Sequence, residues 1–149
     1  MPILGQRSLD MRVFGLSVIV AGCACAASAF TAVNGINAFS EGGDARFEVI
    51  SERGAGPREI WCAAAQYARV VLGEAPNTRI YIARAMGPSP QHNTKNSVSF
   101  TTQPDSTLAS GPRPGDGGNY SVSLKTTGFN LRLAHAEGFC PRIIEEWLD

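Results

Sequence analysis

The chain has 149 residues, of which 44% are hydrophobic and 17% are charged, and its 13 basic residues balance its 13 acidic residues. This length suits one compact domain and is short for two. A formal charge of zero gives no sequence-independent attraction to nucleic acid or to an anionic membrane surface. We therefore predict a single domain that does not bind nucleic acid.

The N-terminal residues have the order of an export signal. Arg12 precedes an apolar run over residues 13–24, and the small residues Ala27, Ser28 and Ala29 follow it. A charge, an apolar core and an A-x-A site in this order are typical of a secretory signal. The apolar run is also too short to span a bilayer as a mature helix.

From this order we expect residues 1–29 to be a signal peptide and residues 30–149 to form one domain, periplasmic or secreted. Asp10 is unusual in a positive N-terminal region, which makes Met11 an alternative start. A second interpretation is a lipoprotein signal, because residues 20–23 read Val-Ala-Gly-Cys. In that case Cys23 would carry lipid and hold the domain on a membrane.

The four cysteines divide between the two segments. Cys23 and Cys25 lie in the signal, whereas Cys62 and Cys140 lie in the exported domain. In an oxidising compartment a single remaining pair is most simply a disulfide. Two distant cysteines and two histidines offer too few ligands for a metal, so we predict neither a metal site nor a cofactor.

The clearest element is a helix over residues 57–73. Pro57 suits the first turn, Glu59 favours the positive end of the helix dipole, and Gly73 is a natural stop. Cys62 falls on the polar side, so the segment carrying Cys140 should cross an outer flank or an end of the helix, away from the sheet. The apolar arc that should face a sheet comprises Ile60, Ala63, Ala64, Tyr67, Ala68 and Val71.

Alternating apolar residues predict strands at residues 46–51, 79–86, 97–101, 120–124 and 129–133. The last two flank a Thr-Thr-Gly turn, which predicts a hairpin between them. The connecting segments are predicted as an extended arm at 30–43, an exposed mobile loop at 104–118 and a short terminal helix at 142–149.

One helix can cover only one face of a sheet, and local alternation of this kind is typical of antiparallel strands. The predicted fold is therefore α+β. It consists of one main helix packed on a mostly antiparallel sheet of about four or five strands, with one disulfide.

The histidines limit the chemistry that we can predict. His135 continues the inward phase of the strand at 129–133, and Glu137 follows in the same phase. This indicates either a histidine–carboxylate pair acting as acid and base or a strand end leaving the core. His92 lies among turn residues and is expected to be solvated. There is no G-x-S-x-G or S-x-x-K nucleophile motif.

Two further patterns have weak functional interpretations. Residues 54–56, Gly-Ala-Gly, stand before a helix as phosphate-binding loops do, but Glu59 occupies the place of a third glycine, so a tight turn is favoured. Arg79, Arg84 and Arg132 recur on predicted strands and could form a basic patch. No aromatic platform is interleaved with them, as nucleic-acid binding would require.

Six segments of the chain form a recognisable set: AFTAVNG (29–35), FEVI (47–50), WCAAAQYAR (61–69), RIYIARAMGPS (79–89), SVSFT (97–101) and GFC (138–140). Together they resemble a group of small exported alphaproteobacterial proteins of unknown function. The resemblance implies export and a Cys62–Cys140 pair, and it transfers no catalytic residue.

Taken together, these patterns predict an exported, non-enzymatic protein. Its partner, a protein or a small molecule, would bind at the exposed loops or at the sheet face that the helix leaves open. Two alternatives remain. One is a small envelope hydrolase that uses His135 and Glu137. The other is a periplasmic enzyme inhibitor that presents the loop at residues 112–118, since small disulfide-bonded domains suit that task.

Overall fold

The computed structural model describes residues 28–43 and 45–142, which form a main helix packed on an antiparallel sheet. The sheet has six strands in the order β1-β2-β3-β5-β4-β6. This confirms the α+β class, although the predicted sheet was one or two strands too small. The strands are β1 (Phe30–Thr31), β2 (Asn37–Ser40), β3 (Arg46–Ile50), β4 (Arg79–Gly87), β5 (Ser97–Thr101) and β6 (Asn130–Arg132).

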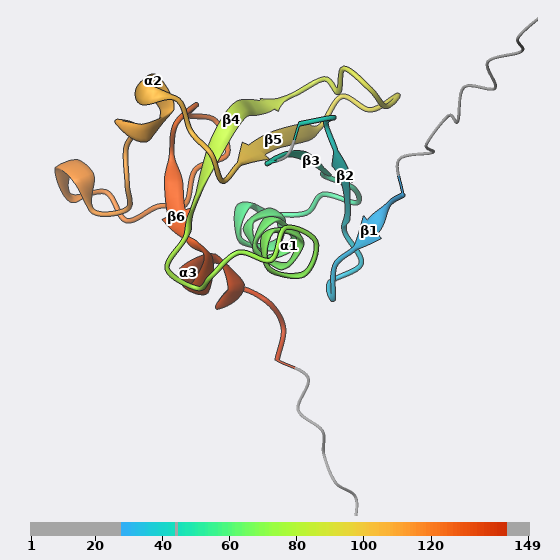
Figure 1. Ribbon diagram of the computed structural model, residues 1–149, viewed down its shortest axis with the longest axis horizontal. Helices are drawn as coiled ribbons and strands as arrows, with labels where there is room; N and C mark the ends of the chain where they lie inside the picture. Colours follow the sequence, from blue (N-terminus) through green and yellow to red (C-terminus); the bar gives the residue numbers. More distant parts are fainter. Residues whose placement is uncertain (1–27, 44, 143–149) are drawn as a thin grey trace, which may run out of the picture.

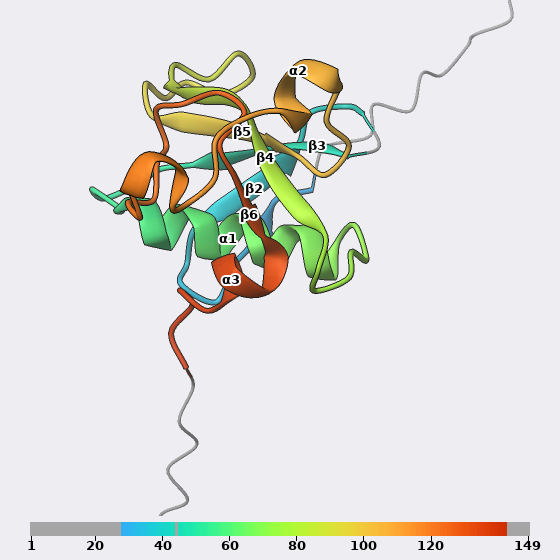
Figure 2. The ribbon, with the colours of Figure 1, turned by 90° about the vertical axis from the view of Figure 1, so that its left-hand side faces the viewer.

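The main helix, α1 (Pro57–Val70), covers one face of this sheet (Figure 1). In the second view α1 runs beneath the strands (Figure 2). The inward residues of the central strands and the predicted arc of the helix, apart from Val71, meet in one core, in which the Trp61 and Phe100 rings are 4.9 Å apart. The buried side chains from the strands include Phe47, Val49, Ile80, Ile82, Val98 and Phe100.

The ends of α1 follow from its sequence. The Gly56 N–H donates to Oε2 of Glu59 at 2.7 Å, which satisfies one free donor at the N-terminus. At the other end Gly73 has φ +69°, and the Glu74 N–H donates to the Ala68 carbonyl at 3.0 Å. The helix therefore ends at Val70. Val71, which we predicted in the buried arc, is exposed.

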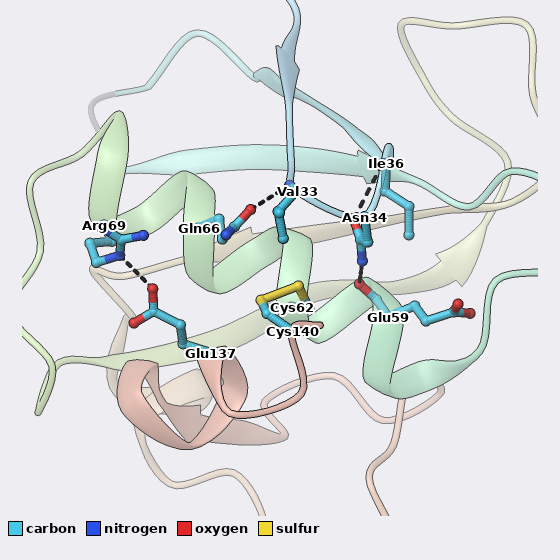
Figure 3. The surroundings of a disulfide bond; sticks show 9 residues. All are labelled: Val33, Asn34, Ile36, Glu59, Cys62, Gln66, Arg69, Glu137 and Cys140. Atoms are coloured by element: carbon cyan, nitrogen blue, oxygen red, sulfur yellow. Dashed lines mark hydrogen bonds and ion pairs between the residues drawn. A yellow bond between two sulfur atoms is a disulfide. The ribbon is translucent and has the colours of Figure 1, made fainter. Parts of the chain in front are cut away.

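The predicted disulfide is confirmed. Cys62 and Cys140 are bonded, with their Cα atoms 4.9 Å apart and a separation of 78 positions in sequence. Cys140 follows α3 (Leu133–Glu137), which lies beside α1 on the flank away from the sheet (Figure 3). Closing so long a loop stabilises the folded state by about 4–5 kcal/mol on the chain-entropy model.

The predicted hairpin between residues 120–124 and 129–133 is wrong. β6 pairs with β4 instead, and Arg79, Ile80 and Tyr81 stand opposite Arg132, Leu131 and Asn130. The pairing continues towards the turn, where the Ile82 N–H donates to the Phe129 carbonyl at 2.9 Å. β6, which we had expected to pair with residues 120–124, therefore pairs with β4.

Residues 120–124 form no strand because other parts of the fold hold them. The indole N–H of Trp61 donates to the Ser123 carbonyl at 3.0 Å, and the Met86 N–H donates to the Leu124 carbonyl at 2.9 Å. These bonds attach the segment to α1 and to the far end of β4. Local alternation alone could not reveal either long-range contact.

The predicted strand at 129–133 also continues differently. From Leu133 the chain is helical, and the Leu133 and Ala134 N–H groups donate to the carbonyls of Thr78 and Pro76 at 2.8 and 2.9 Å. The turn before β4 thus satisfies the first donors of α3. His135 consequently lies on a helix rather than on a strand.

Two predictions fall wholly or mainly outside the described residues. These are the signal peptide at 1–29, with the alternative lipid site at Cys23, and the terminal helix at 142–149. None of the helices within residues 28–43 and 45–142 has the length and apolar character needed to cross a bilayer.

Candidate functional site

A cavity lined by three arginines lies at the β6 edge of the sheet. It has a volume of about 390 Å³. It lies between the sheet edge and the loop at 112–120, which is orange in Figure 1 and stands beyond β6. We call it the arginine cavity. Its lining residues are Arg79, Arg113, Pro114, Asp116, Tyr120, Leu131, Arg132 and His135.

Two of the arginines stand opposite each other on the neighbouring strands β4 and β6. Arg79 begins β4 and Arg132 ends β6, and the register makes them direct partners. The neighbouring pair, Ile80 and Leu131, is buried in the core, so alternation directs the two arginines away from α1. Like charges directly opposite each other in an antiparallel pair are destabilising. The fold therefore tolerates an unfavourable pair at this position.

Asn130 brings the third arginine into place. Its side-chain amide is buried and donates to the carbonyls of Gly111 and Pro112, both at 3.3 Å. Its Oδ1 accepts a hydrogen bond from Nη1 of Arg79 at 2.8 Å. One side chain thus anchors the loop that carries Arg113 and also orients the Arg79 guanidinium.

A close backbone approach supports the same loop. Gly111 packs directly against Gly128, so a Cβ atom at position 111 would collide with the backbone of Gly128. Two short helices, α2 (Ser106–Ala109) and η1 (Asp116–Gly118), lie in this connection. The connection that we predicted as exposed is largely exposed, and it is attached to β6 at this point.

The electrostatics of the arginine cavity are unbalanced. Burial lowers the pKa of Arg79 below its ordinary value, and the nearby charges of Arg113 and Arg132 lower it further. Among residues 28–43 and 45–142, no carboxylate forms an ion pair with any of these three guanidinium groups. The cavity lining consequently carries an excess of positive charge, with three arginines against the single carboxylate of Asp116.

Asp116 is the acidic residue in the cavity lining, and it serves the loop rather than the arginines. Its Oδ2 accepts the backbone N–H of Arg113 at 2.8 Å. This bond closes the turn from Arg113 to Asp116. Both residues also line a second cavity, of about 360 Å³. That second cavity has a less charged lining, with Lys125 and side chains such as Val122, Leu124 and Phe129.

The predicted pair of His135 and Glu137 is not brought together on one face. His135 lines the arginine cavity, and its ring lies 5.3 Å from that of Phe139. Glu137 faces α1, where its Oε1 accepts a hydrogen bond from Nε of Arg69 at 2.5 Å (Figure 3). Residues two apart on a helix project to different sides. The hydrolase that would use both residues stays a prediction.

The predicted basic patch divides in the structure. Arg79 and Arg132 meet, but Arg84 lies at the other end of β4, where Nη2 is 3.4 Å from Oε1 of Glu48. Sequence reasoning missed Arg113, because a loop residue gives no periodic signal. It also discounted an aromatic contribution, whereas Tyr120 lines the cavity with 78% of its surface exposed.

The Arg84 end of the sheet is a second polar cluster, on the face without α1. Glu48 has no exposed surface. Its Oε2 lies 3.2 Å from Nδ1 of His92, and the His92 ring lies 4.2 Å from that of Phe39. His92, which we expected to be solvated, therefore packs on the sheet. Arg84 also donates to Oγ of Ser97 at 2.9 Å.

The cluster around Glu48 balances its own charges. Burial by itself raises the pKa of Glu48, but hydrogen bonds from Ser89, Ser97 and His92, together with the charge of His92, outweigh burial and lower it. Glu48 thus keeps its negative charge beside Arg84. The network holds the β4–β5 connection on the sheet and has no unsatisfied side-chain polar atom among the described residues.

The remaining predicted sites have structural roles. Residues 54–56 form the tight turn that precedes α1, with Arg53 and Gly54 both at positive φ. Both cysteines are in the disulfide and offer no thiol. Within residues 28–43 and 45–142, no three His, Cys, Asp or Glu side chains gather as a metal site would require.

Comparison with known proteins adds no identification, since no family model, curated protein or solved structure matches the chain.

Proposed function

We propose that the protein is an exported, non-enzymatic binding protein whose ligand places an anionic group in the arginine cavity. One observation carries this proposal. Arg79 and Arg132 are direct partners across β4 and β6, Arg113 joins them, and none of the described carboxylates forms an ion pair with these three guanidinium groups. An anion would relieve their repulsion and accept bidentate hydrogen bonds from guanidinium groups.

The proposed location outside the cytoplasm rests on two features. The N-terminal segment has the order of an export signal, and the domain contains a disulfide over a long loop. A disulfide of this kind is compatible with an oxidising compartment. It also holds α3, which contributes His135 to the cavity, against α1.

The proposal is tested with the full chain, exported and oxidised by an expression host. Inorganic phosphate is the probe, and its binding is measured by titration calorimetry at low ionic strength. Arg132→Gln should weaken phosphate binding about tenfold or more, because a hydrogen bond to a charged group contributes about 1.5–3 kcal/mol. Added sodium chloride should also weaken binding.

Lys95→Gln is the matched control. It removes one positive charge from the exposed β4–β5 connection and leaves the cavity lining unchanged. Phosphate should bind this variant as it binds the natural protein. Absence of phosphate binding in the natural protein, or equal weakening in Lys95→Gln and Arg132→Gln, would contradict an anion site at the arginine cavity.

A further inference from the structure

We infer that the ligand of the arginine cavity is a sugar phosphate, in which a phosphate monoester is attached to a sugar that carries free hydroxyl groups. This inference rests on the proposed anion site. It adds the chemical class of the ligand, and it follows from three different side-chain types in one cavity lining: the arginines, Asp116 and Tyr120.

The arginines favour a phosphate monoester over a single carboxylate. Three guanidinium groups and His135 line the cavity, and Arg113 and Arg132 are close enough to Arg79 to disfavour its charge. A carboxylate brings one negative charge, whereas a phosphate monoester brings about 1.5–2 at neutral pH and three acceptor oxygens. The phosphate therefore offers one acceptor oxygen for each of the three guanidinium groups and compensates more of the repulsion.

The presence of Asp116 in the lining indicates that the ligand has hydrogen-bond donors as well as an anionic group. Its carboxylate would repel phosphate oxygens, yet it lies in the lining of the same cavity. Oδ2 accepts the Arg113 N–H, while Oδ1 has no hydrogen-bond donor among residues 28–43 and 45–142. A ligand that also offers hydroxyl groups can donate to Oδ1. Such a ligand turns an unfavourable neighbour of the anion into a favourable contact.

Tyr120 supplies a flat apolar surface at the edge of the cavity. It is 78% exposed, well above Val70, the next most exposed large hydrophobic residue described, at 58%. The edge of its ring packs against Gly115, where a Cβ atom would stand only 3.2 Å from Cε1. The turn thus supports the ring from one side, and a sugar ring or an attached base can lie against its face.

The test compares three probes: inorganic phosphate, ribose 5-phosphate and adenosine 5′-monophosphate. Ribose 5-phosphate should bind the natural protein about tenfold or more tightly than inorganic phosphate, since it adds hydroxyl contacts to the same anion. If adenosine monophosphate binds more tightly still and Tyr120→Ala removes that increment, the base lies on Tyr120. If both sugar phosphates bind alike, the sugar occupies that place.

Asp116→Asn separates recognition from turn structure. The amide oxygen of asparagine can still accept the Arg113 N–H, so the turn is preserved. The variant should bind inorganic phosphate equally or more tightly, because a repelling charge is gone, and it should lose most of the preference for ribose 5-phosphate. A structural defect would instead weaken both probes together.

Two results distinguish this inference from the proposed function. If inorganic phosphate binds and ribose 5-phosphate binds no more tightly, the sugar-phosphate assignment is wrong and the anion site stands. If none of the three probes binds, or if Arg132→Gln leaves the binding of all three unchanged, both are wrong.

Discussion

The two ends of β4 each carry an arginine, and the charges around these two arginines differ. Arg84 reaches across β5 to a buried carboxylate on β3, where Glu48 and Arg84 both stand opposite the small residue Ser99. Arg79, five positions earlier on the same strand, stands opposite another arginine. The first charge is compensated within the fold, whereas the second is left for something else to compensate.

This difference separates structural charge from charge that is available to a ligand. At the Arg84 end, an arginine, a histidine and two serines surround the Glu48 carboxylate, Glu41 also lies 4.0 Å from Arg84, and the resulting network holds a loop in place. At the Arg79 end, the hydrogen bonds of Asn130 position Arg79 and the loop that carries Arg113, but no described carboxylate forms an ion pair with either arginine. The formal net charge of the chain is zero, so composition alone would reveal neither the compensated arginine nor the uncompensated one.

Glu48→Gln should have the largest effect on stability. It removes the nearer carboxylate partner of Arg84 and leaves Glu41, 4.0 Å away, so it should lower the free energy of unfolding by about 2–3 kcal/mol, less than for a fully buried pair because Arg84 is partly exposed. Urea denaturation measures this loss. The matched control is Glu137→Gln, whose partner Arg69 is half exposed. The control should lose less than about 1 kcal/mol, and equal losses would remove the distinction between the two pairs.

Acid should weaken the Glu48 cluster in a defined window. The pKa of Glu48 is lower in the folded protein than its ordinary value of 4.5, so its stabilising charge is fully present above that value. The contribution is lost as pH falls through the folded pKa. Urea denaturation between about pH 7 and pH 3 should therefore show a gap between the natural protein and Glu48→Gln that narrows in acid. A gap independent of pH would mean that the charge of Glu48 is unimportant.

Arg132→Gln should have a smaller effect on stability than Glu48→Gln, and with the opposite sign. It removes one member of a like-charged cross-strand pair and should raise the free energy of unfolding by up to about 1 kcal/mol, while it weakens phosphate binding. Arg69→Gln is the comparison, because Arg69 has a carboxylate partner in Glu137. That variant should lose a few tenths of a kcal/mol. A clear loss of stability in Arg132→Gln would assign Arg132 to the structure rather than to a ligand.

Sequence reasoning identified the elements that local patterns define. The predicted bounds lie within a few residues of the observed bounds for α1, β3, β4 and β5. The Cys62–Cys140 pair was also predicted. Each depends on the spacing of apolar residues, on a terminal residue such as Pro57 or Gly73, or on the number of cysteines. The position of Cys62 on the polar side of α1 also predicted the flank along which Cys140 passes.

The pairing of the strands could not be predicted in the same way. Residues 120–124 alternate as a strand does, yet Trp61 and Met86 hold them elsewhere, and β4 takes β6 as its neighbour. Leu133 alternates with Leu131 in sequence but begins α3, because the carbonyls of Pro76 and Thr78 accept the first helix donors. These partners are distant in sequence, so a local pattern does not contain them.

The candidate site shows the same division. The sequence by itself determined which residues carry charge, that Arg79 and Arg132 lie on strands, and that His135 is one of two histidines. Only the tertiary structure decided that Arg79 and Arg132 are direct partners, that Asn130 brings Arg113 beside them, and that Arg84 is neutralised by Glu48. The physical reason is that helix and strand periodicity is local, whereas the register of β4 with β6 and the balance of buried charge depend on segments far apart in the chain.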